Sequence, residues 1–209
     1  MAEAAPRLYL ITPTLADAAG FDVALEAALE AGDVACVFLR MQVMAGSESK
    51  KLVARLAALA QKHDAALLIE DPQLAARCDA DGVHVSGVGA ALEAAVAAMK
   101  PDRIVGVGGL SSRHEAMLAG DSSADYVMFG VSEAEDDGPG ILERTTWWAE
   151  IFNLPCVAYA RTLADVAPLV AAGADFIALG EAVWEHPQGA AAAVKAAMLT
   201  LAEAQEPLR

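Results

Sequence analysis

Cysteines, basic residues and long apolar runs are all scarce in this sequence. The three cysteines, Cys36, Cys78 and Cys156, are odd in number and widely spaced, with no Cys-x-x-Cys pair. Their number and spacing suggest neither a disulfide framework nor a zinc site, so buried or idle thiols are expected. No apolar run approaches the roughly 18 residues that a transmembrane helix needs. We therefore expect no membrane partner.

The shortage of basic residues limits the partners further. The chain has 14 lysines and arginines against 29 aspartates and glutamates, a formal net charge of −15. Nucleic acids and anionic membranes are bound through basic patches, so a nucleic acid is not expected as a partner either. The first residues, Met1-Ala2-Glu3-Ala4, lack the basic segment that begins a signal peptide. A cytoplasmic protein is the expectation.

The sequence contains a regular alternation of short apolar runs with alanine-rich segments of helical length. Eight runs predict strands, at Leu8–Thr12, Val34–Arg40, Ala66–Glu70, Gly82–Val85, Arg103–Val107, Tyr126–Gly130, Pro155–Ala160 and Phe176–Gly180. The intervening segments predict helices, at Phe21–Ala31, Ser49–His63, Pro72–Cys78, Ala90–Met99, Ser112–Gly120, Leu142–Phe152, Leu163–Ala172 and Gly189–Ala204. Eight strands, each followed by a helix, predict an α/β fold in which residues 1–209 form a single (β/α)8 TIM barrel.

A repeated pair of residues supports the barrel. A small residue followed by an aspartate opens the second, fourth, sixth and eighth predicted strands, at Gly32-Asp33, Ala80-Asp81, Ala124-Asp125 and Ala174-Asp175. The aspartates are 48, 44 and 50 residues apart, about one (βα)2 unit each. We interpret them as turn residues at the end of the barrel where the strands begin, with no catalytic role.

The active sites of such barrels lie where the strands end, a face called the mouth below. Asp71, beside Glu70 and before Pro72, suits a hard cation such as Mg²⁺, although an aspartate before proline is equally suited to cap a helix. Arg40 suits a phosphate, or an ion pair with one of those carboxylates. His84 lies within a buried strand, which favours a hydrogen-bonded core histidine over a catalytic one.

Three further segments attract attention. Gly106–Gly109 resembles a phosphate-binding loop, because glycine lets backbone amides approach an anion, but glycine-rich strand ends are common. Ser132–Gly140 predicts an acidic loop after the sixth strand. The Trp147-Trp148 pair is expected to pack within a helix, with an interface role as the alternative. Alanine-rich outer helices and this pair are compatible with a homodimer without requiring one.

Taken in order, these segments resemble thiamine-phosphate synthase and its relative, the thiazole tautomerase TenI, over about residues 7–200. The matching segments are Leu8–Thr12, Phe38–Arg40, Ile69–Asp71, Ala80–Val85, Val105–Val107, Ala124–Gly130 and Ala172–Asp175. The most specific of them reads Ala-Asp-Gly-Val-His and ends at His84.

The resemblance implies a (β/α)8 barrel that joins hydroxymethylpyrimidine pyrophosphate to thiazole phosphate. The products would be thiamine phosphate and pyrophosphate, with Mg²⁺ holding the pyrophosphate and cations offsetting the charge that builds on it. Arg40, Asp71 and His84 would be catalytic, and Asp71 and Glu70 would hold the metal. The positions that would bind the small phosphorylated molecule are Arg40, Gly106, Gly108, Gly130, Arg161, Gly180 and Glu181.

Several positions depart from the family pattern. Gln42 stands where the family has a phosphate-binding lysine, and Gly89 where it has a second metal-binding aspartate. Arg161 replaces one glycine of a Gly-Gly pair, and Glu181 replaces the serine whose loop holds the thiazole phosphate.

The mouth is consequently acidic, with seven carboxylates against two guanidiniums. The carboxylates are Glu70, Asp71, Glu133, Glu135, Asp136, Asp137 and Glu181, and the guanidiniums are Arg40 and Arg161. Like charges about 4 Å apart cost on the order of a few kcal/mol per pair. Three hypotheses follow: a thiamine-phosphate synthase, a non-catalytic descendant that binds a small ligand or a partner protein, and an enzyme with an altered substrate such as a cation or an amine.

Overall fold

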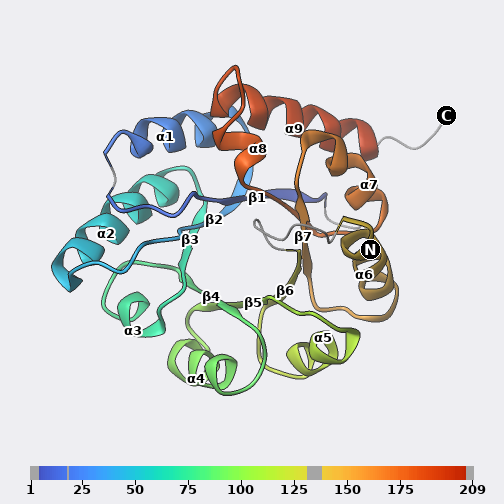
Figure 1. Ribbon diagram of the computed structural model, residues 1–209, viewed down its shortest axis with the longest axis horizontal. Coiled ribbons are helices and arrows are strands. Elements are labelled where there is room, and N and C mark those ends of the chain that lie inside the picture. The colour runs from blue at the N-terminus through green and yellow to red at the C-terminus, as the bar shows by residue number, and fades with distance from the viewer. Residues whose placement is uncertain (1–4, 18, 131–137, 206–209) are drawn as a thin grey trace.

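The computed structural model describes residues 5–17, 19–130 and 138–205. Eight parallel strands close into a barrel in sequence order, β1 to β8, with the helices outside it (Figure 1). The strands are β1 Arg7–Ile11, β2 Val34–Phe38, β3 Ala66–Ile69, β4 Gly82–Ser86, β5 Ile104–Gly108, β6 Tyr126–Phe129, β7 Cys156–Ala160 and β8 Phe176–Leu179. The predicted (β/α)8 barrel is confirmed.

The helices follow the strands as predicted, with one addition. They are α1 Phe21–Ala31, α2 Gly46–Lys62, α3 Pro72–Ala75, α4 Ala90–Met99, α5 Arg113–Gly120, α6 Gly138–Ile151, the 3₁₀ turn η1 Leu163–Asp165, α7 Val166–Ala171, α8 Glu181–Trp184 and α9 Ala190–Gln205. The short helix α8 had not been predicted. No helix in the described part of the chain is long and apolar enough to cross a membrane.

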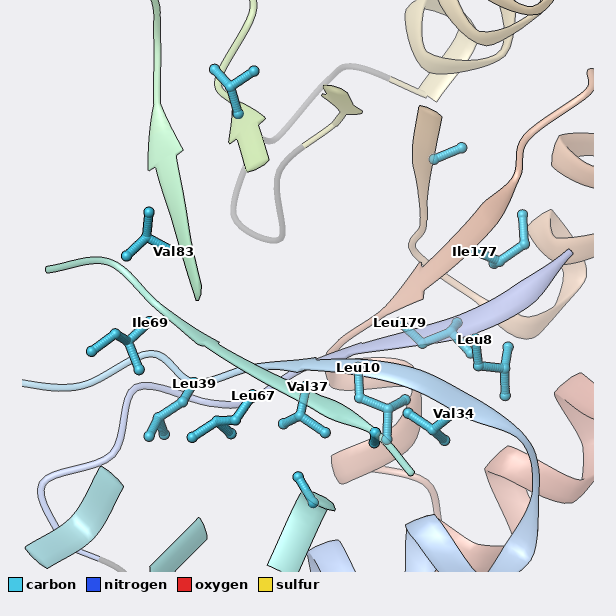
Figure 2. Close-up of a cluster of buried hydrophobic side chains, with 14 of the residues drawn as sticks. Leu8, Leu10, Val34, Val37, Leu39, Leu67, Ile69, Val83, Ile177 and Leu179 are labelled. Carbon is cyan, nitrogen blue, oxygen red and sulfur yellow. The ribbon is translucent and has the colours of Figure 1, made fainter. Parts of the chain in front are cut away.

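Side chains along the strands alternate between two cores. Those that point outward, including Leu10, Val37 and Leu67, pack against the surrounding helices (Figure 2). Those that point inward fill the barrel, and they include Tyr9 and Tyr126. This alternation follows from the twofold period of a strand, and burial on both faces accounts for the nearly continuous apolar runs in the sequence.

The repeated aspartates form one arrangement at the amino-terminal rim, where the strands begin. In three of the four repeats, the aspartate backbone N–H donates to the carbonyl of a residue in the preceding strand. The N–H of that same residue donates back to the aspartate Oδ2. We call this an aspartate clamp. The clamps join Asp81 to Leu67 at 2.7 Å, Asp125 to Val105 at 2.7 Å and Asp175 to Cys156 at 2.8 Å, measured from N to Oδ2.

The fourth aspartate is held differently. Asp33 accepts two hydrogen bonds from the guanidinium of Arg7, at 2.8 and 2.7 Å, and both side chains are largely exposed. The interpretation of all four as structural residues at this rim agrees with these contacts. The expected packing of the tryptophan pair is also confirmed, because Trp148 is fully buried, stacks on Phe152 and donates its indole N–H to the Leu154 carbonyl.

Candidate functional site at the barrel mouth

A cavity of about 160 Å³ lies at the mouth, between the ends of β1, β2 and β8. Its lining includes Thr12, Arg40, Gly180, Glu181 and Trp184. The indole N–H of Trp184 donates to the carbonyl of Ile11 at 2.6 Å, so the short helix α8 is fastened across the end of β1. The structure therefore brings three of the predicted binding residues, Arg40, Gly180 and Glu181, to one cavity.

Tyr159, which sequence reasoning had not selected as a site residue, connects the ends of the neighbouring strands β7 and β8. Its hydroxyl donates to Glu181 Oε2 at 2.6 Å. Burial and this hydrogen bond to a carboxylate raise the pKa of Tyr159, while the charges of Arg161 and Arg40 act in the opposite direction. A Cβ on Gly180 would lie 3.1 Å from the tyrosine hydroxyl, so glycine leaves room for the contact.

The two arginines of the mouth line two different cavities, Arg40 with Glu181 and Arg161 with Tyr159. The backbone N–H of Arg40 donates to Thr12 Oγ1 at 3.0 Å, which fixes the chain just after β2. Arg161 lines a second cavity, of about 140 Å³, together with Tyr159 and Asp165. Both guanidiniums therefore act on the tyrosine whose hydroxyl is bonded to a carboxylate, and Arg161 takes up the position where the family pattern has glycine.

Asp71 caps helix α3, which is one of the two roles predicted for it, the other being Mg²⁺ binding. Its Oδ1 accepts the backbone N–H groups of Gln73 at 2.8 Å and Leu74 at 3.2 Å. A carboxylate in this role keeps lone pairs on its second oxygen. Across the residues that the structure describes, no group of three close metal-ligating side chains includes Asp71 or Glu70. These residues therefore fit a Mg²⁺ ion only if substrate phosphate and water supply its remaining ligands, which is a common arrangement for that ion.

His84 lies inside the barrel, in a chain of hydrogen-bonded side chains. Its Nδ1 is 2.8 Å from the hydroxyl of Tyr126, which is in turn 2.9 Å from the hydroxyl of Tyr9. The imidazole is 5% exposed and packs against Phe38. Burial lowers its pKa to about 4, so the ring is neutral at pH 7. These contacts match the interpretation of His84 as a hydrogen-bonded core histidine.

Two of the predicted phosphate-loop glycines lie within a strand. Strand β5 runs to Gly108, one residue beyond the predicted end at Val107, so Gly106 and Gly108 do not have the loop conformation that their resemblance to a phosphate-binding loop suggested. A Cβ on Gly106 would lie 1.9 Å from Tyr126 Cζ, and one on Gly108 would lie 2.7 Å from His84 Nε2. The large side chains packed opposite β5 therefore require glycine at both positions.

Gly130 follows β6 and has a φ of +89°, a conformation that favours glycine. A Cβ there would lie 2.6 Å from Ile141 Cδ1.

The loop predicted at Ser132–Gly140 ends earlier than expected, because α6 begins at Gly138. Glu133, Glu135, Asp136 and Asp137 lie outside the described residues.

This arrangement, a closed parallel (β/α)8 barrel with polar side chains gathered where the strands end, defines the class of barrels that bind small ligands at that face. Within the class, residues 8–183 match the model of the family described as thiamine monophosphate synthase. The chain belongs to that family.

Relatives similar over nearly the whole chain agree with this assignment. A protein of Rhodospirillum centenum named thiamine-phosphate synthase is 45% identical over 194 residues, covering 90% of this chain and 94% of its own. One of Hyphomonas neptunium with the same name is 41% identical over 201 residues, covering 91% of each. The solved structure of a thiamine phosphate pyrophosphorylase from Pyrococcus furiosus is 24% identical and has the same fold, with a TM-score of 0.81 over 96% of this chain and 97% of that one.

Proposed function

We propose that the chain acts in thiamine biosynthesis through its barrel mouth, joining hydroxymethylpyrimidine pyrophosphate to thiazole phosphate far more slowly than an ordinary member of its family. The reaction is supported by the 45% identity to a protein of that name over nearly the full length of both chains. The low rate is supported by one observation above others. The carboxylate of Glu181, held by Tyr159, opens helix α8 at the position where the family pattern has a phosphate-binding serine.

The charges around that carboxylate explain the expected loss of rate. A phosphate placed in the 160 Å³ cavity would meet Glu181 as well as Arg40. Like-charge contact at about 4 Å costs on the order of 1 to 4 kcal/mol, depending on the local dielectric. The phosphate would therefore be bound weakly and positioned poorly, and both effects slow a reaction that depends on placing two substrates together.

Asp71 is the residue that would hold Mg²⁺, through an oxygen not engaged in capping α3, with Glu70 beside it. When bound, the ion would offset negative charge on the departing pyrophosphate. Arg40 would add a positive charge in the 160 Å³ cavity. The family pattern also has a lysine at the position of Gln42, which this chain lacks.

The test is a direct assay of thiamine phosphate formation from both substrates and Mg²⁺, run beside the Rhodospirillum centenum relative. We expect turnover roughly 100-fold below the relative, the size of effect that follows when a charge-stabilising contact is lost. Glu181→Ser should recover part of the deficit, and Asp71→Asn should remove the remaining turnover. A rate equal to that of the relative would contradict the proposal, and so would a Glu181→Ser variant with no gain.

A second candidate is a binding protein for an amine or another cation at the mouth, because the Tyr159–Glu181 pair offers an exposed carboxylate that lines the 160 Å³ cavity. This candidate predicts no turnover with either wild type or Glu181→Ser. It also predicts that a thiazole or aminopyrimidine without phosphate binds more tightly than its phosphate ester, measured by calorimetry. Tighter binding of the phosphate esters would exclude it.

A further inference from the structure

Three possible metal ligands meet near the amino-terminal rim, at the opposite end of the barrel from the mouth. They are Glu26 and Glu30 of α1 and His63, which directly follows α2. One oxygen of each carboxylate and one nitrogen of the imidazole all lie within 4.8 Å of one another. Both helices end shortly before the next strand begins, so they finish at this rim, and they are neighbours in the outer ring (Figure 1).

The backbone of the two helices brings these side chains together. Glu26 and Glu30 are four residues apart, so they share one face of α1. Asp64 has a φ of +57°, a left-handed conformation that is typical just beyond a helix end. The backbone N–H of His63 donates to the Ala60 carbonyl at 2.9 Å, which fixes this residue at the end of α2. The imidazole is therefore held beside the two carboxylates by the way in which α2 ends.

The imidazole of His63 gives a second and independent observation. The ring is partly exposed, yet its Nε2 atom is buried and has no hydrogen-bond partner. Among the described residues, it is the only buried side-chain nitrogen or oxygen atom without a partner. Buried polar atoms are normally paired, so an exception points to a water or an ion that completes the site. The unpaired atom and the close spacing of three ligands thus occur at the same residue.

The charges at this end of the two helices favour a cation. Lys62 Nζ lies 2.8 Å from Glu26 Oε1, and this single ammonium group offsets only one of the two carboxylates. In the part of the chain that the structure describes, Glu30 forms no ion pair. The negative ends of the α1 and α2 dipoles also lie at this rim. A positive ion would therefore be stabilised there.

We propose that Glu26, Glu30 and His63 bind a divalent transition-metal ion such as Zn²⁺, with water as its remaining ligand. A mixed set of imidazole and carboxylate ligands suits Zn²⁺, whereas Mg²⁺ prefers oxygen ligands alone. Ligand atoms around such an ion lie about 3.4 Å apart, so the side chains would need to close by about 1 Å. The ion would join α1 to α2, and its site is separate from the reaction proposed at the mouth.

Calorimetric titration with Zn²⁺ tests the assignment, using the chain without an affinity tag and with Asp71→Asn to remove the predicted Mg²⁺ ligand. We expect one ion per chain. The double variant H63A/E30Q should weaken binding at least about tenfold. The matched control is H114A/E203Q, which removes an exposed histidine and an exposed glutamate that belong to no such group. Its affinity for Zn²⁺ should change less than about twofold.

Two further measurements give readouts that a merely structural role would not change. Lys62→Gln should bind Zn²⁺ more tightly, because Glu26 loses the ammonium group that competes with the ion. Zn²⁺ should also raise the urea midpoint of the parent chain but not that of H63A/E30Q, because an ion that binds only the folded state stabilises it. Circular dichroism would show that each variant is folded.

Four outcomes would overturn the assignment. They are a Kd for Zn²⁺ in the millimolar range in the parent chain, unchanged affinity in H63A/E30Q, equal weakening in the two double variants, and weaker binding in Lys62→Gln. None of these measurements uses the substrates of the proposed reaction. The metal site can therefore fail while the proposed function stands, and the proposed function can fail while the metal site stands.

Discussion

At the amino-terminal rim of the barrel, three strands are held by the same aspartate clamp, whereas at the mouth the strands end in different side chains. The clamps differ by no more than 0.1 Å in the distance from backbone nitrogen to Oδ2. At the mouth, Asp71 caps a helix, Tyr159 bonds to Glu181 and Arg40 is fixed through Thr12. The rim repeats one backbone geometry, whereas each contact at the mouth joins a different pair of groups.

Asp125→Ala should produce the largest effect on folding, because it breaks a clamp and also removes the partner of Lys100. Hydrogen bonds to charged groups contribute about 1.5 to 3 kcal/mol each, so we expect the free energy of unfolding to fall by about 2 kcal/mol in urea titrations. Thiamine phosphate formation at the mouth, the opposite end of the barrel, should be unchanged.

The control for this variant lies at the same rim. Asp33→Ala removes an aspartate of the same repeat whose side chain, among the described residues, is bonded to the partly exposed guanidinium of Arg7. Exposed ion pairs contribute about 0 to 1 kcal/mol, so its effect should be below that of Asp125→Ala. Equal losses in the two variants would show that the clamp itself adds nothing.

Midway between the two ends, His84 predicts a dependence of stability on pH. Burial lowers its pKa to about 4, from about 6.5 in the unfolded chain. The folded state therefore excludes a proton that the unfolded state binds, and stability is lost as the pH falls from about 6.5 towards 4. By linkage, His84 should account for a loss of about 2 kcal/mol between pH 7 and pH 5.

The measurement is the free energy of unfolding of the wild type and of His84→Gln at both pH values. The variant starts from a lower stability, because it loses the bond to Tyr126, but it should lack the contribution of His84 to the pH dependence. Identical losses between pH 7 and pH 5 in the two proteins would show that the imidazole remains neutral in both states or titrates freely in both.

These differences explain which features could be predicted from sequence. The strands are encoded locally by apolar runs. The clamping aspartates are encoded by a pair of residues that recurs about once in every two βα units. The helix cap at Asp71 was one of two predicted roles, because an aspartate directly before a proline is a local pattern that predicts a cap. The Tyr159–Glu181 contact joins residues 22 positions apart on neighbouring units, and no local pattern encodes it. Similarly, Gly106 resembled a loop glycine until the strand register placed Tyr126 against it.

Glu181→Gln should have the smallest effect on stability and a specific effect on the mouth. The amide can still accept a hydrogen bond from Tyr159, so the free energy of unfolding should change by less than about 1 kcal/mol. The negative charge that raises the pKa of the tyrosine is removed, while Arg161 and Arg40 remain. The pKa of Tyr159 should therefore fall, which ultraviolet titration of the wild type, Glu181→Gln and Tyr159→Phe would resolve.

A phosphate ester should also bind more tightly to Glu181→Gln than to the wild type, because the mouth has lost a carboxylate that repels it. Unchanged phosphate affinity would mean that the charge of Glu181 does not determine which ligand the mouth binds. The rim and the mouth would then differ in their hydrogen-bond geometry but not in the effect of their charges on binding.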